Sequence, residues 1–185
     1  MLFNSLTFFI FLPTVFVLYW FVLKGRLKSQ NVLILIASYV FYAWWDWRFL
    51  SLIVFSTLLD YSLGLAIGKS TSRQKSKILL WTSLLVNLGF LGVFKYYNFF
   101  VESWVDAFAS LGVDMQVSTL SIILPVGISF YTFQTLSYTI DVYRKQLQPT
   151  SSLLNFAAYV AFFPQLVAGP IERATNLLPQ FYKKR

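Results

Sequence analysis

The residue types best suited to chemistry gather in one stretch of this sequence, between positions 129 and 141. Helical spacing arranges them in two neighbouring rows, one of Ser129, Thr132, Thr135 and Thr139 and the other of Tyr131, Gln134, Tyr138 and Asp141. The opposite side of the same helix is apolar, with Val126, Phe133, Leu136 and Ile140. Unsatisfied hydroxyl and amide groups are costly in lipid, so the polar half is expected to line a bundle interior or a wet passage. Hydrogen bonding between helices, at about 0.6 kcal/mol per pair, is the alternative role.

An acidic residue inside an apolar run is the second candidate. Asp60 lies well within the run 49–67, where an ionised carboxylate needs a cation, several donors or water, and is otherwise protonated. Gly64 and Gly68 follow one turn apart and allow another helix to approach closely. Asp60 is a candidate for lining a polar passage, and the alternative is a structural aspartate tied to a neighbouring helix. Asn87, in the next run, is expected to join helices rather than to bind a substrate.

The residue types that are missing restrict the chemistry further. The sequence contains no histidine and no cysteine. Imidazole bases, histidine-based triads, disulfides and the usual histidine or thiolate metal sites are therefore excluded for this chain. Phosphate-binding loops, nucleophile elbows and zinc-binding patterns are also not found. No catalytic residue and no metal ligand are assigned.

The composition indicates whether this chain lies in water or in a lipid bilayer. Of its 185 residues, 57% are hydrophobic, 20% are aromatic and only 12% are charged, and the mean hydropathy is +0.64. A soluble domain carries about 25% charged residues. The chain is thus expected in a lipid bilayer, and the soluble, disordered and coiled-coil classes are excluded.

Six apolar runs organise the sequence. Their approximate bounds are 6–23, 31–45, 49–67, 78–94, 120–143 and 153–168. They predict an all-α, multi-pass transmembrane protein with about five spanning helices and a sixth segment that spans or re-enters the membrane. Pro13 need not break the first helix, because neighbouring helices can satisfy the freed carbonyl. Residues 99–119 carry three acidic side chains and are expected to form a loop with a short amphipathic surface helix.

The placement of charge indicates orientation rather than a nucleic-acid partner. The net charge of +8 comes largely from basic residues in short gaps between apolar runs, where topology signals are found. Basic loops tend to stay in the cytoplasm. With the amino terminus outside, the loops 24–28 and 69–77 and the residues 144–145 lie inside, and the acidic stretch 102–114 lies outside.

The end of the sequence departs from this alternation. A sixth full crossing would put the basic residues 183–185 outside. A re-entrant or interfacial segment is favoured because helix-breaking residues crowd it, namely Pro164, Gly169 and Pro170. Glu172 and Arg173 are adjacent and do not face each other on a helix, so each is expected to reach a different partner. A solvated pair at the membrane surface is the alternative.

Two stretches of the sequence resemble one known family. The first extends from Leu124 to Arg144 and reads LPVGISFYTFQTLSYTIDVYR, and the second extends from Phe162 to Ile171 and reads FFPQLVAGPI. Both closely resemble the membrane-bound O-acyltransferase family. The opening MLFNS and the aromatic motif YVFYAWWDW at 39–47 are similar to the amino-terminal part of its bacterial alginate O-acetyltransferase branch.

The resemblance implies a function and a set of tunnel residues. Such enzymes pass an acyl group, typically acetyl from a cytoplasmic thioester such as acetyl-CoA, through a membrane tunnel to an exported polysaccharide or a partner protein. No cofactor is expected to stay bound. The positions that match the family pattern are assigned to the tunnel wall and its cytoplasmic mouth: Gln134, Tyr138, Asp141, Arg144, Pro164, Gly169, Pro170, Glu172 and Arg173.

The essential histidine of the family lies in a later helix and has no counterpart here. The resemblance therefore implies that residues 1–185 form the amino-terminal transmembrane part of such a domain, incomplete at its carboxyl end and inactive alone. A natural shortened paralogue is the alternative account. Its expected partners are the bilayer, the remaining carboxyl-terminal helices and extracytoplasmic polysaccharide-modifying proteins, in a bacterial cytoplasmic (inner) membrane. The alternative is a non-catalytic scaffold or conduit in a polysaccharide export or modification complex.

Overall fold

The regular elements of this chain are helices. The computed structural model describes residues 4–110, 125–170 and 172–184, and within these ranges no strand occurs. The long helices are α1 (Leu6–Val17), α2 (Leu27–Asp46), α3 (Leu50–Lys69), α4 (Arg73–Ser110) and α5 (Ile128–Tyr143). The shorter elements are the π-helical η1 (Leu18–Val22), the 3₁₀ turns η2 (Trp47–Phe49) and η3 (Leu178–Tyr182), and the helices α6 (Leu153–Val160), α7 (Phe163–Ala168) and α8 (Ala174–Leu177). The all-α prediction is confirmed.

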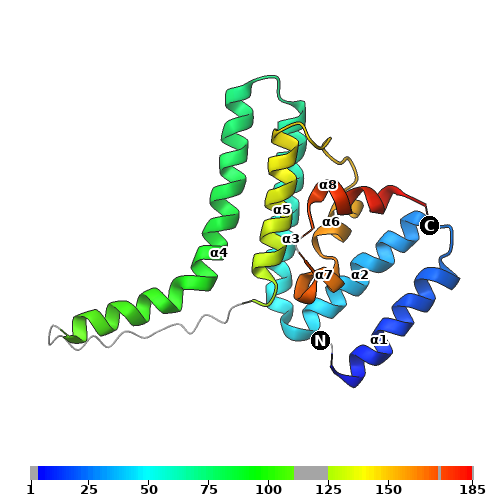
Figure 1. Cartoon of the computed structure of the whole chain (residues 1–185), viewed down its shortest axis with the longest axis horizontal. Coiled ribbons are helices and arrows are strands. Elements are labelled where there is room, and N and C mark those ends of the chain that lie inside the picture. Colours follow the sequence, from blue (N-terminus) through cyan, green and yellow to red (C-terminus); the bar gives the residue numbers. More distant parts are fainter. Residues whose placement is uncertain (1–3, 111–124, 171, 185) are drawn as a thin grey trace.

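Three helices form the centre of the arrangement. Helices α3, α4 and α5 lie side by side and make the most extensive helix–helix contacts (Figure 1). Helix α2 packs against α6 and α7, and α1 lies on the outer side of α2 (Figure 1). Helix α8 contacts α5, so the carboxyl-terminal elements pack against the same central helix as α3 and α4. Most of α5 is buried as a result.

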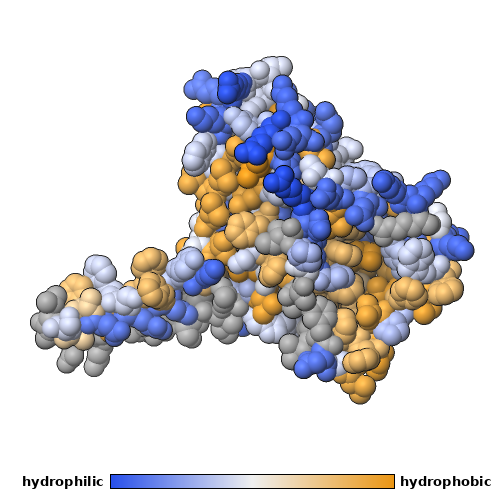
Figure 2. Space-filling model, in the orientation of Figure 1, coloured by the Kyte–Doolittle hydropathy of each residue, from blue (hydrophilic) through white to orange (hydrophobic). Residues whose placement is uncertain are grey.

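Apolar side chains cover much of the outer surface. Two stretches have the length and hydropathy of membrane spans, Leu27–Lys69 and Arg73–Ser110, and only 33% and 11% of their apolar windows are buried within the chain. The core helices of a soluble protein would be buried, so these faces require another apolar environment. Figure 2 shows hydrophilic residues at the end of the molecule where α3 meets α4, above a broad apolar band. This distribution is typical of a membrane protein.

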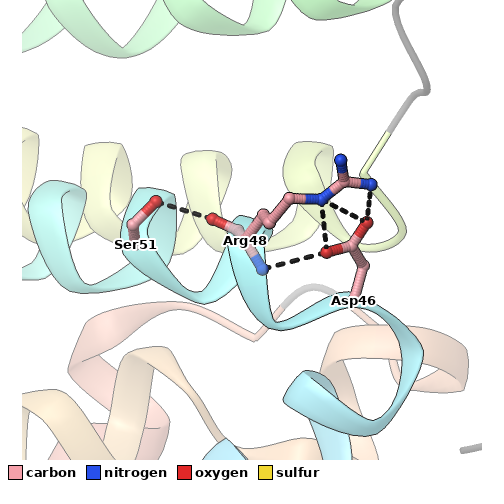
Figure 3. A network of polar contacts seen from close by, with 3 residues as sticks. All are labelled: Asp46, Arg48 and Ser51. Atoms are coloured by element: carbon pink, nitrogen blue, oxygen red, sulfur yellow. Dashed lines mark hydrogen bonds and ion pairs between the residues drawn. The ribbon is translucent and has the colours of Figure 1, made fainter.

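A local ion pair stabilises the turn between α2 and α3. Asp46 ends α2, and its carboxylate accepts hydrogen bonds from the backbone N–H of Arg48 at 2.9 Å and from the guanidinium at 2.7–3.1 Å (Figure 3). Ser51 then donates to the carbonyl of Arg48 at 2.7 Å.

Helices α2 and α3 each have 20 residues, about 30 Å of helix, which matches the thickness of a bilayer core.

Helix α4 corrects one prediction. The fourth run was expected to end near position 94, before a loop with a short amphipathic surface helix, whereas α4 continues without a break to Ser110. Residues 95–110 contain neither proline nor glycine, so no residue in them breaks the helix. Glu102 and Asp106 consequently lie on an exposed helical arm that leads away from the other helices (Figure 1), and Asp114 is outside the described residues.

The sixth apolar run is broken in the middle. Helix α6 ends at Val160, and α7 begins at Phe163 with Pro164 in its first turn. The backbone N–H of Phe163, freed by the break, donates to the Ser38 hydroxyl of α2 at 3.2 Å. Helix α6 is enclosed by protein, since Phe156, Ala158, Tyr159 and Val160 are fully buried. The run is therefore divided into two short helices, and the choice between crossing and re-entry stays a prediction.

Candidate functional site

A buried aspartate joins the three central helices. Asp60 of α3 has no exposed surface, and its Oδ2 accepts a hydrogen bond from Asn87 Nδ2 of α4 at 2.8 Å. Its Oδ1 accepts hydrogen bonds from the hydroxyl of Ser83, also on α4, and from Thr139 Oγ1 of α5 at 3.0 Å. Three donors thus replace the water that a carboxylate would otherwise need. These contacts agree with the alternative role given for Asp60, that of a structural aspartate tied to neighbouring helices. The predicted role of Asn87 in joining helices is confirmed.

The two polar rows of α5 both lie inside the bundle. Of their eight members only Ser129 is partly exposed, and the other seven are buried. Phe133 is 44% exposed and Val126 is 39% exposed, as expected for an apolar side toward lipid. Leu136, which was assigned to that side, is instead buried, because α5 packs against other helices over most of its circumference. The division of α5 into a polar inner face and an apolar outer face is otherwise confirmed.

Gln134 is the most unusual member of these rows. Its side chain is only 1% exposed, yet neither the Nε2 nor the Oε1 atom has a hydrogen-bond partner within the described residues. A buried unsatisfied amide costs about 1–3 kcal/mol, so a native protein retains one for a reason. The Gln134 backbone carbonyl, in contrast, accepts from the Tyr159 hydroxyl at 3.1 Å, which anchors the backbone at this position. The amide is held in place without a partner.

Two further orphaned groups lie on neighbouring elements. Asp141 is 5% exposed and its Oδ2 has no partner in the described chain, while its backbone carbonyl accepts from Gln146 and Leu147. Gln165 of α7 donates to the carbonyl of Pro170 at 2.8 Å, but its Oε1 is unpaired. Because α5 and α7 are in contact, these groups extend the set of unsatisfied polar atoms beyond Gln134.

Tyr138 packs where α3 and α5 approach most closely. Its hydroxyl accepts from the backbone N–H of Thr150 at 3.2 Å, and its ring lies 4.4 Å from that of Phe156 between centroids. A Cβ added at Gly64 would lie 2.5 Å from the ring of Tyr138, and one at Gly68 would lie 2.3 Å from Pro149. The predicted close approach of another helix is confirmed at Gly64, whereas the neighbour of Gly68 is a loop residue.

The close contact at Gly64 gives a stability prediction. Gly64→Ala is expected to destabilise the protein by about 1–3 kcal/mol, because the enclosed ring of Tyr138 has little room to move. The matched control is Gly89→Ala on α4, where a Cβ meets nothing within 4 Å and alanine is the better helix former. Thermal unfolding in detergent should show a lower midpoint for Gly64→Ala alone. Equal midpoints would contradict the packing.

The remaining site candidates lie nearer the surface. Arg144, Pro164, Pro170 and Arg173 are exposed, and Gly169 and Glu172 are half-buried. No ion pair joins Glu172 to Arg173, and Glu172 instead accepts a long hydrogen bond of 3.5 Å from Asn176. A Cβ at Gly169 would lie 2.7 Å from the Cα of Gln165, so this glycine allows the chain to turn tightly after α7. Within the described ranges, no cluster of potential metal ligands is found.

Sequence reasoning missed a buried amide pair at the start of α2. Asn31 is 2% exposed and donates to the Asn155 side chain at 3.0 Å and to the Phe181 carbonyl at 2.7 Å. Gln30 donates to the Tyr19 carbonyl at 3.0 Å, beside the π-helical turn. The sequence did contain a signal for this pair, since Gln30 and Asn31 are adjacent amides at the edge of an apolar run. These bonds tie α2 to α6 and to the carboxyl-terminal segment.

Fold and site together define an all-helical membrane protein with a buried carboxylate and an orphaned amide on its central helix. No family model matches the sequence, and no solved structure matches it significantly.

Curated relatives identify the kind of protein more closely. The chain is 45% identical over 183 residues to the probable alginate O-acetylase AlgI of Pseudomonas syringae and 46% identical over 183 residues to that of Pseudomonas aeruginosa. These matches cover 98% of this chain and 35% and 34% of the two relatives. A peptidoglycan O-acetyltransferase of Helicobacter pylori is 32% identical over 212 residues, which cover the whole chain and 39% of that protein. The resemblance to the membrane-bound O-acyltransferase family is thereby confirmed, and the chain spans about a third of the length of the curated relatives it matches.

Proposed function

We propose that this chain forms part of a membrane O-acetylase that moves an acetyl group from a cytoplasmic acyl thioester, such as acetyl-CoA, to an exported polysaccharide. The relatives are named for alginate and for peptidoglycan, and alginate is the acceptor of the relatives with higher identity. The observation that carries the proposal is Gln134, a buried amide on the central helix with both polar atoms unpaired. Such a group makes no hydrogen bond within the described residues and is suited to bind a polar ligand or its water.

The residues of this chain would bind and orient the reactants. Gln134 and Asp141 offer hydrogen-bonding groups on one side of α5, and Gln165 offers another from α7. Asp60 and Tyr138 would position α5 through their bonds to α4 and to the Thr150 backbone. None of these residues is assigned as nucleophile or general base, and the remaining helices of the whole protein would complete the tunnel and supply the base.

A chimera tests this proposal. The corresponding segment of the Pseudomonas aeruginosa relative is replaced by this chain and expressed in a strain that lacks the native protein, and acetyl groups on secreted alginate are then measured. Restored acetylation at a substantial fraction of the native level is expected. A chimera that is stable and correctly inserted but leaves alginate unacetylated would overturn the proposal. In that event the second candidate, a non-catalytic scaffold or conduit, would be favoured. The lack of histidine in this chain supports that candidate.

The proposal includes a location and an orientation. The protein would lie in the cytoplasmic membrane with its amino terminus outside, with about five spans and a sixth segment formed by α6 and α7. The basic loop between α3 and α4 would then be cytoplasmic, and the far end of α4 would be outside.

Single cysteines check this orientation. The chain contains no cysteine, so Ser72→Cys and Ser110→Cys each introduce a unique thiol at an exposed position. An impermeant thiol reagent applied outside intact spheroplasts is expected to label the cysteine at position 110 and to leave that at position 72 unlabelled. Both should react after permeabilisation. The reverse pattern in intact cells would invert the topology.

A further inference from the structure

The hydrophilic end of the molecule contains a cavity lined by unpaired cations. It has a volume of about 350 Å³ and lies between the loop that joins α3 to α4 and the end of α5. Its lining includes the cations Arg73, Arg144 and Lys145 and the hydroxyl residues Ser70, Thr71, Ser76 and Tyr143. None of the three cations forms an ion pair with any carboxylate of the described chain, Asp141 on the same helix included. The cavity therefore gathers positive charge and hydroxyl groups with no carboxylate of the described residues paired to the cations.

The start of α4 has an unfavourable arrangement of charge. Its first five residues contain Arg73, Lys75 and Lys77 and no acidic side chain. The amino-terminal end of a helix carries partial positive charge and is stabilised by anions, so cations there are destabilising. The Ser72 hydroxyl accepts only a long hydrogen bond of 3.4 Å from the N–H of Lys75. An anion held at this end would relieve the repulsion.

Lys145 provides an independent indication at the other wall. Among the described non-glycine residues, only Lys145 has a positive φ, at 58°. It ends α5 in a Schellman arrangement, in which its N–H bonds to the Val142 carbonyl at 3.0 Å and the N–H of Gln146 bonds to the Asp141 carbonyl at 2.9 Å. Glycine is the preferred residue at this position because other side chains are strained there. A lysine at this position lowers the stability of the folded chain relative to glycine, and it adds a cation to the lining of the cavity.

We propose that this cavity binds a phosphate group, with Arg73, Arg144 and Lys145 as its charged ligands and the hydroxyls of Thr71 and Tyr143 as additional donors. Arginine and lysine together with hydroxyl groups at a helix amino terminus are the donors that recognise phosphate oxygens. The phosphate belongs either to an anionic lipid of the adjacent leaflet or to a water-soluble molecule. This inference does not depend on the acetyl-transfer proposal.

Positive charges that merely set membrane topology would look different. Topology requires basic residues in a loop, but it does not require them to converge on one cavity or to occupy a strained backbone position. Lys77 has the same charge as its neighbours and lies in the same turn, yet it does not line the cavity. It is therefore the matched control for Arg73.

The test compares phosphate binding by the purified whole chain and its variants. In one arm, native mass spectrometry counts bound phosphatidylglycerol against phosphatidylcholine. In the other, thermal unfolding is recorded with pyrophosphate or with chloride at equal ionic strength. Preference for phosphatidylglycerol identifies a lipid ligand, and stabilisation by pyrophosphate alone identifies a soluble one. The proposal is overturned if neither probe binds.

The variants separate a phosphate site from general electrostatics. Arg73→Gln and Arg144→Gln are expected to weaken binding at least tenfold, and Lys77→Gln less than twofold. Lys145→Gly is expected to raise the unfolding midpoint of the ligand-free protein, because the strain at φ 58° is removed, and also to weaken binding at least tenfold. Equal losses of binding for Lys77→Gln and Arg73→Gln, or unchanged binding by Lys145→Gly, would contradict a phosphate site. The cations would then serve only to set the membrane topology.

Discussion

Replacing Asp60 by leucine is expected to destabilise the protein by about 1–3 kcal/mol, because buried donors on two other helices lose a shared acceptor. Leucine fills much of the same volume but removes the acceptor that Ser83, Asn87 and Thr139 share. Asn87 and Thr139 each keep a hydrogen bond to a backbone carbonyl, whereas the Ser83 hydroxyl has no other acceptor within the described residues. These donors come from α4 and α5, so the loss affects all contacts at the centre of the bundle. Chemical unfolding in mild detergent, followed by tryptophan fluorescence, measures the change.

Two further variants show whether the loss comes from this network. Asp106→Leu removes an exposed carboxylate from α4 and should leave stability nearly unchanged. Asn87→Leu combined with Asp60→Leu should cost less than the sum of the two single changes, because both changes remove the same hydrogen bond between Asn87 and Asp60. If Asp60→Leu were as stable as the parent, the carboxylate would not be joining the helices.

Replacing Gln134 by leucine is expected to have opposite effects on stability and on activity. The stability of the chain should stay the same or rise by about 1 kcal/mol, because an unpaired buried amide is replaced by an apolar side chain. In the chimera, acetylation of alginate should fall at least tenfold, because the amide would no longer bind the reactants or their water. Unfolding midpoints and the acetyl content of secreted alginate provide the two readouts.

Two controls belong to this experiment. Gln30→Leu changes a buried glutamine whose Nε2 donates to the Tyr19 carbonyl, although its Oε1 is unpaired within the described residues, and should therefore lower stability by about 1 kcal/mol. Phe133→Leu alters the residue beside Gln134 on the outer side of α5 and should leave acetylation close to the parent level. Full acetylation with Gln134→Leu would remove this residue from any polar passage.

Periodicity in the sequence predicted the main features of the central helix. Polar residues at three- to four-residue intervals indicated that one side of the helix near position 134 avoids lipid, and this side is buried. The same reasoning failed at the ends of elements. It ended the fourth helix at position 94, because Lys95 and the following polar residues resemble a loop, although no residue before 110 breaks the helix.

The sequence by itself determined the solvent, the helical class and the absence of histidine and thiolate chemistry, because these follow from composition and from short-range periodicity. Only the tertiary structure decided which polar groups are satisfied. Asp60 and Gln134 are both polar residues within apolar helices, yet Asp60 meets donors from two other helices, whereas the Gln134 amide meets no partner in the part of the chain that the structure describes. That difference depends on contacts between residues up to 79 positions apart, which helix packing sets and which no local pattern encodes.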